Sequence, residues 1–193
     1  MDGPSPAFDD DRPVLVIGFG NLLRGDDGVG PRVAEAVAGW NLSGVVALAV
    51  HQLLPELAES LSHARFVIFA DADVGPPGGS VIVSPLAPRW SLHAIAHVSD
   101  PPVLLALAQA LYGRCPPAIL LRIPVRDVNV GCSLSPLAET GARQALHRIA
   151  LHLAEQGVVV RPDMLSPARS RTGPHAGRPP ELPEGLREQD VLQ

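Results

Sequence analysis

The sequence is poor in aromatic residues, cysteine and positive charge. Aromatic side chains make up 4% of the 193 residues while 46% of residues are hydrophobic, so a core must consist mostly of Ala, Val, Leu and Ile. Two cysteines, Cys115 and Cys132, are too few for a disulfide framework. The net charge of −5 excludes nucleic acid as the main partner, because no basic patch could offset the phosphate charge.

The chain also lacks targeting and membrane signals. No apolar run reaches the ~18 residues that a membrane helix needs. The start, MDGPSPAFDDDRP, is acidic and proline-rich, unlike a signal peptide. We therefore expect a cytoplasmic protein without membrane insertion, divided into a disordered leader (1–12), a single α/β domain (13–160) and a disordered tail rich in Pro and Arg (161–193).

One stretch, VLVIGFGNLLRGDDGVG at residues 14–30, organises the rest of the chain. Its apolar start without alternation predicts a strand buried on both faces, as in parallel sheets. The glycines that follow allow a tight turn into a helix, and the turn carries two adjacent carboxylates, Asp26 and Asp27. Ligands bind at the carboxyl ends of such strands, so chemistry is expected beside this pair.

Strands and helices alternate along the whole chain. This order predicts a three-layer α/β/α sandwich with a mainly parallel twisted sheet of about five strands. The expected strands are 14–17, 45–50, 66–70, 119–123 and a shorter one at 80–83, and the expected helices are 29–39, 53–61, 100–112 and 135–153. Residues 84–100 show little periodicity and are expected to form a loop.

Two common kinds of site fit the sequence poorly. The turn begins like the dinucleotide motif GxGxxG, but Leu23 stands at the third glycine position and His51, not an acidic residue, ends the second strand. A serine hydrolase is disfavoured because there is no GxSxG motif. Cys115 and Cys132 have no histidine partner recognisable in the sequence, which favours core or loop thiols.

A metal site is the third possibility. Asp27 follows the first strand, Asp71 ends the third, and His97 lies in the loop before the helix that starts near residue 100. If the first and third strands are neighbours, both carboxylates face the same crevice, and the loop can bring in an imidazole. The alternative stays open, since an Asp after a strand is often a helix cap and a loop His is usually only solvated.

The glycine turn, GFGNLLRGDDGVG at residues 18–30, closely resembles the opening motif of the hydrogenase maturation endopeptidases. The resemblance continues through HQLLPELAE (51–59), FVIFADA (66–72) and GCSLSP (131–136), and covers about residues 13–157. It implies a nickel-dependent endopeptidase that removes the C-terminal extension of the [NiFe]-hydrogenase large-subunit precursor after nickel insertion. The precursor would be the partner and would carry the nickel, so the enzyme need not hold the metal tightly.

The resemblance also implies the site residues. The metal-contacting positions of the family fall on Asp27, Asp71 and His97, with Asp27 and Asp71 as the catalytic pair. We expect both carboxylates to be ionised at neutral pH and His97 to be largely neutral, so that all three can donate lone pairs. His93 is the alternative ligand, although the spacing to the following Leu-rich helix favours His97. Asp26 is expected to matter less, because it need not face the same crevice.

Two other functions remain compatible with these residues. The same three side chains would serve a non-catalytic nickel carrier or scaffold in hydrogenase assembly, or an unrelated metallohydrolase. The sequence identifies neither the group that attacks the peptide bond nor the oligomeric state.

Overall fold

The computed structural model describes residues 11–75, 79–90 and 100–165, which contain a five-stranded sheet with the order β2-β1-β3-β5-β4. Neighbouring strands are parallel except β4, which lies at one edge and pairs antiparallel with β5. The strands are β1 (Val14–Phe19), β2 (Val45–Val50), β3 (Phe66–Asp73), β4 (Ile82–Leu86) and β5 (Ala118–Pro124). The predicted mainly parallel sheet of five strands is therefore confirmed.

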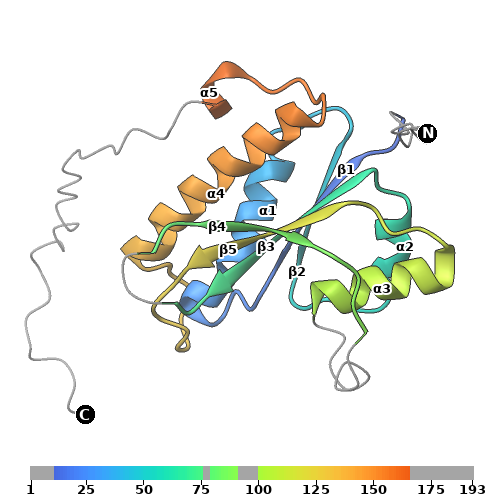
Figure 1. The fold of residues 1–193 in the computed structure, drawn as a ribbon. Helices are drawn as coiled ribbons and strands as arrows, with labels where there is room; N and C mark the ends of the chain where they lie inside the picture. The colour runs from blue at the N-terminus through green and yellow to red at the C-terminus, as the bar shows by residue number, and fades with distance from the viewer. Residues whose placement is uncertain (1–10, 76–78, 91–99, 166–193) are drawn as a thin grey trace, which may run out of the picture.

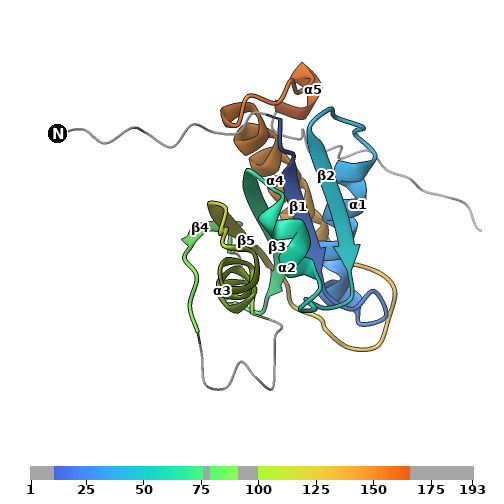
Figure 2. The ribbon, with the colours of Figure 1, turned by 90° about the vertical axis from the view of Figure 1, so that its right-hand side faces the viewer.

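Helices cover both faces of this sheet and form the outer two layers of the predicted sandwich (Figures 1 and 2). Helices α1 and α4 pack on one face, and α2 and α3 pack on the other. The bounds are η1 (Gly25–Gly28, a 3-10 turn), α1 (Val29–Ala38), α2 (Leu57–Ser62), α3 (Pro101–Tyr112), α4 (Pro136–Glu155) and α5 (Pro162–Leu165).

The core is divided by the sheet into two clusters, and β1 contributes to both. Val14 and Val16 face α1 and α4, whereas Leu15 and Ile17 face α2 and α3. Successive side chains of a strand point to opposite faces, so a central strand covered on both sides must be apolar at every position. This explains the unbroken apolar run at the start of the domain.

Glycine allows the turn after β1 and the start of α1 to lie directly against the sheet. A Cβ atom on Gly18 would lie 1.9 Å from the carbonyl oxygen of Gly30, and one on Gly30 would lie 2.5 Å from that of Ala70. Gly20 has a φ of +139°, which side-chain-bearing residues rarely adopt. The contacts place the turn above the carboxyl ends of β1 and β3.

Three expected boundaries differ from the structure. Strand β3 continues to Asp73, because β5 pairs with it through Pro124, so Asp71 lies inside the strand instead of ending it. Strand β4 reaches Leu86, into the expected loop, because it pairs with β5 as far as Ala118.

The third difference is at residues 161–165, the start of the segment expected to be disordered. They carry α5, whose Met164 packs with only 8% exposure. Residues 1–10 and 166–193, where most of the expected leader and tail fall, lie outside the described residues. None of the helices in the described part is long and apolar enough to cross a membrane.

Candidate active site

The proposed site lies where the parallel strands β1 and β3 end side by side. Gly18 on β1 is paired with Ala70 on β3, so the condition under which both carboxylates can face the same crevice is met. Asp71 follows Ala70, and Asp27 lies in the η1 turn above the same edge. The structure therefore brings two of the three expected side chains together, close enough for the charge of Asp27 to act on Asp71.

Asp71 is a partly buried carboxyl with an unusual proton affinity. Its pKa is raised to about 7 by burial, with smaller contributions in the same direction from the nearby charges of Asp27 and Asp73; a hydrogen bond from the Ala72 N–H to Oδ1 (2.8 Å) acts in the opposite direction. The carboxyl is then about half protonated at neutral pH. Our expectation of full ionisation was wrong for this residue, because the sequence does not show how deeply a side chain is buried.

Asp27 is held by the turn that precedes it. Its Oδ2 accepts a hydrogen bond from the backbone N–H of Asn21 (2.9 Å), and Oδ1 of Asn21 accepts one from the N–H of Leu23 (2.9 Å). The Asp27 side chain is only partly buried. Its carboxylate is therefore oriented by the backbone of residues 21–23 and still accessible to a ligand.

Asp26 is fully buried, with 0% exposure, and its carboxylate is bound to the loop that follows β5. Its Oδ2 accepts hydrogen bonds from the backbone N–H groups of Arg126 and Asp127 (3.0 Å each) and from the Ser135 hydroxyl (2.7 Å). Its Oδ1 accepts one from the Ser135 N–H (2.6 Å). Sequence reasoning missed this role, because every donor comes from a segment about 100 residues downstream.

A surface groove of about 450 Å³ opens beside Asp27, between the turn residues 20–23 and residues 49–51 at the end of β2. Asn21, the residue that holds Asp27, is part of its wall. Leu22 and Leu23 line the groove and are 40% and 65% exposed. The groove has the character of a binding cleft, because it is largely apolar and shares Asn21 with the Asp27 carboxylate.

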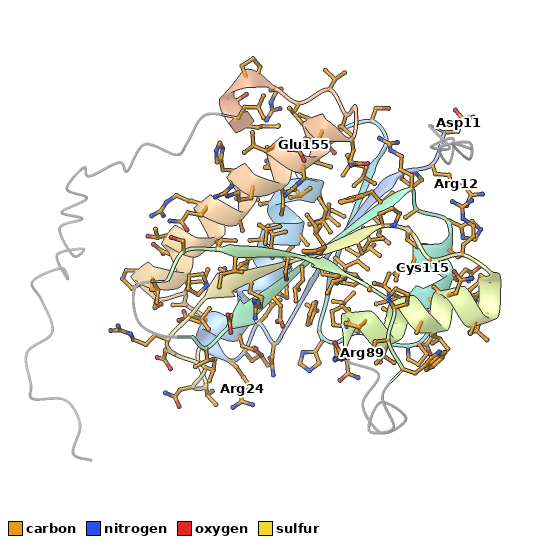
Figure 3. All side chains as sticks on the ribbon, viewed as in Figure 1. Asp11, Arg12, Arg24, Arg89, Cys115 and Glu155 are labelled. Carbon is orange, nitrogen blue, oxygen red and sulfur yellow. The ribbon has the colours of Figure 1, made fainter. Side chains whose placement is uncertain are left out.

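The two free cysteines differ in position and burial. Burial raises the pKa of the Cys115 thiol, which disfavours its nucleophilic form. Figure 3 shows Cys115 on the α3 side of the molecule, far from Arg24, which marks the glycine turn. Cys132 is exposed, and its carbonyl accepts a hydrogen bond from the Arg32 guanidinium (2.5 Å). A cysteine nucleophile therefore has no support at Cys115.

The third expected ligand, His97, and its alternative His93 lie outside the described residues. Within the described ranges no group of three His, Cys, Asp or Glu side chains is arranged to hold a metal ion. The carboxylate pair itself suits a divalent cation, since Asp27 and Asp71 repel each other and offer the hard oxygen donors that such ions accept. The full ligand set remains a prediction.

Comparison with known proteins points to one family. No model of a known protein family matches the chain. The chain is 31% identical to the hydrogenase expression/formation protein HupD of Thiocapsa roseopersicina over 211 residues, which cover 94% of this chain and 90% of HupD.

Solved structures agree with this relationship. The hydrogenase-maturating endopeptidase HybD from E. coli superposes with a TM-score of 0.59 and 25% identity, covering 76% of this chain and 94% of HybD. The hydrogenase 2 maturation peptidase from a Thaumarchaeota archaeon superposes with a TM-score of 0.54 and 25% identity, covering 74% of this chain and 98% of the peptidase. The HycI protease of Thermococcus kodakarensis, at 20% identity and a TM-score of 0.56 over 77% and 94% of the two chains, shares the fold. By its sequence identity to HupD along nearly its whole length, this chain belongs to the hydrogenase maturation endopeptidase family.

Proposed function

We propose that this protein is an endopeptidase that removes the C-terminal extension of the [NiFe]-hydrogenase large-subunit precursor after nickel has been inserted. Two relatives are described as a maturating endopeptidase and a maturation peptidase, which supports peptide-bond hydrolysis. The observation that carries the proposal is the pair of interacting carboxyl groups, Asp27 and Asp71, at the carboxyl edge of β1 and β3.

The raised pKa of Asp71, about 7, suits this carboxyl group to proton transfer near neutral pH. A carboxyl with a pKa near the working pH can accept a proton from an attacking water and donate one to the departing amine. Asp71 is therefore assigned the transfer of the proton. Asp27, held by the Asn21 N–H, contributes a fixed carboxylate that orients the reacting groups.

Nickel belongs to the substrate in this proposal. Asp27, Asp71 and His97 would contact it, and a cation between the two carboxylates would relieve their repulsion. Such oxygen and nitrogen donors do not favour nickel unaided, because copper binds most of these sites more tightly. Selectivity then comes from the ligands of the precursor, and the enzyme alone is expected to bind nickel weakly.

The groove beside Asp27 supports the use of a peptide substrate. Its apolar wall, formed partly by Leu22 and Leu23, can bury side chains of an extended segment that approaches the carboxylates. The groove is open at the surface and has about 450 Å³ of space, so it can receive a chain end without unfolding the domain.

The decisive experiment is mass analysis of a nickel-loaded large-subunit precursor before and after incubation with the purified protein. We expect loss of a single C-terminal peptide, and no loss with the nickel-free precursor or with Asp71→Asn. A stable complex without any cleavage would instead identify a carrier or scaffold. Cleavage of the nickel-free precursor, or a tightly bound endogenous zinc, would contradict the nickel-dependent reaction and favour another metallohydrolase.

A further inference from the structure

We propose, on the basis of the proposed function, that Asp26 is a positioning residue that sets the placement of Asp27 by holding the η1 turn to the loop at 125–135. Asp26 does not contact the substrate, because its side chain has 0% exposure. Its role is therefore separate from that of its neighbour Asp27.

The carboxylate of Asp26 receives four hydrogen bonds, all from one distant segment. Three come from the backbone N–H groups of Arg126, Asp127 and Ser135, and the fourth comes from the Ser135 hydroxyl. The buried carboxylate has no access to water, and these four donors take the place of hydrogen bonds from water. Asp26 is thus a firmly held anchor, since hydrogen bonds to a charged acceptor are the strong ones.

Backbone contacts around Asp26 extend the same attachment. The N–H of Asp26 donates to the Asp127 carbonyl (2.8 Å), and the N–H of Gly25 donates to the Gly131 carbonyl (2.6 Å). Gly131 donates in return to the Leu23 carbonyl (3.0 Å). The turn and the loop form one hydrogen-bonded unit, and the carboxylate of Asp26 lies within it.

Ser135 connects this unit to α4, the longest helix of the described residues. The same hydroxyl that donates to Asp26 accepts a hydrogen bond from the Ala138 N–H (3.2 Å) and so caps the N-terminus of α4. The turn is therefore fixed to a 20-residue helix that packs on the sheet. An attachment of this kind transmits the rigidity of the core to the turn.

Asp27 is the residue that benefits from this attachment. It follows Asp26 directly, so its Cα lies about 3.8 Å from that of Asp26, and holding Asp26 in place restricts where Asp27 can lie. Its own carboxylate has a backbone donor, Asn21, within the same turn. A reacting group displaced by about 1 Å can lose a hundredfold in rate, so holding Asp26 in place has a catalytic consequence.

The test compares kcat and KM for cleavage of the nickel-loaded precursor by full-length variants at a temperature where all are folded. Asp26→Asn is expected to lower kcat about tenfold to a hundredfold with KM within about twofold, because geometry is lost but the groove is kept. Leu153→Ala, a buried position on α4 remote from the site, is the matched control: it should lower the melting temperature comparably and leave kcat within about twofold.

A second pair of variants covers the case in which Asp26→Asn does not fold. Ser135→Ala removes one donor to Asp26 and is expected to lower kcat, whereas Ser135→Thr keeps the hydroxyl and should restore it. Unchanged kcat in both Asp26→Asn and Ser135→Ala would overturn the proposal, and so would an equal loss of kcat in Leu153→Ala.

A readout without cleavage separates this proposal from the proposed function. The Asn21 N–H, which donates to Asp27, should exchange its hydrogen faster in Asp26→Asn than in the wild type and Leu153→Ala. If the wild type does not cleave the precursor, the proposed function fails, but faster exchange still supports the attachment. Unchanged exchange would overturn the positioning role even in an active enzyme.

Discussion

The turn after β1 and the end of β3 each remove a carboxyl group from water, but the pKa of the carboxyl is lowered in the turn and raised on the strand. Asp26 in the turn is surrounded by four hydrogen-bond donors, and its pKa is lowered despite complete burial. Asp71 on β3 has one backbone donor, from Ala72, and two carboxylate neighbours, and its pKa is raised to about 7. Burial alone does not determine the charge of a carboxyl; the donors that accompany it do.

The difference separates two roles along one sheet edge. A buried carboxylate that accepts four hydrogen bonds is fixed in charge and in place, which suits an anchor. One with few donors near another carboxylate changes its charge near neutral pH, which suits proton transfer. The predictions below test this division.

The largest effect is expected from Asp71→Asn on activity. The amide keeps the size of the side chain but cannot carry the proton, so cleavage should fall by about 10³-fold. Single-turnover assays on the nickel-loaded precursor would measure the loss, and circular dichroism would check that the fold is retained. Wild-type cleavage by the variant would remove Asp71 from the mechanism, and an unfolded variant would assign it a structural role.

Asp26→Asn should have the largest effect on stability. The new NH₂ group faces N–H donors in a site with 0% exposure, so the free energy of unfolding at pH 7 should fall by about 3 kcal/mol. Because the folded pKa is lowered, the stabilisation by Asp26 is complete above the unfolded pKa of 3.8 and is lost as pH falls through the folded pKa. Urea titrations at several pH values would show the difference from the wild type shrinking in acid; equal stability at pH 7 would contradict the anchor role.

His97→Ala should lower activity about tenfold more than His93→Ala, as expected if only His97 is a metal ligand that adds to the carboxylate pair. The two variants are matched, since each removes one imidazole from the same segment. Cleavage rates with the nickel-loaded precursor would measure the ratio. A reversed order would move the ligand assignment to His93.

Asp71 should make the wild type less stable as pH rises, whereas Asp26 makes it more stable as pH rises. Its folded pKa is raised, so the native state binds more protons than the unfolded state between pH 3.8 and about 7. The wild type should therefore lose stability relative to Asp71→Asn as pH rises through this window, by at most about 1.4 kcal/mol per pH unit. Chemical denaturation of both proteins at pH 5, 6, 7 and 8 measures this; parallel curves would show that Asp71 has no raised pKa.

The smallest effect is a shift in the titration of Asp71 when a neighbour loses its charge. Asp27→Asn should lower the pKa of Asp71, because a like charge is removed. Asp73→Asn is the matched control and should lower the pKa of Asp71 less, since the charge of Asp27 has the larger effect on that pKa. Carbon NMR of the Asp71 carboxyl against pH would resolve both. No change in Asp27→Asn would mean that the two carboxyls do not interact.

Local patterns were sufficient to predict the sheet and its helices. The run at 14–17 predicted a strand buried on both faces, and the alternation of strands and helices predicted the layers. The sequence left the adjacency of β1 and β3 open, as a condition for a shared site, and the structure meets this condition. These features depend on side-chain periodicity, which a sequence displays directly.

Tertiary structure alone decided what each aspartate does. In the sequence Asp26 and Asp27 are chemically identical neighbours, but Arg126, Asp127 and Ser135 surround only Asp26 with donors. The pKa of Asp71 depends in the same way on burial by the packed domain and on the turn that brings Asp27 close. Local sequence motifs indicate which carboxyl groups belong to the site. Their proton affinities depend on hydrogen-bond donors and charges that only the folded chain brings close to them.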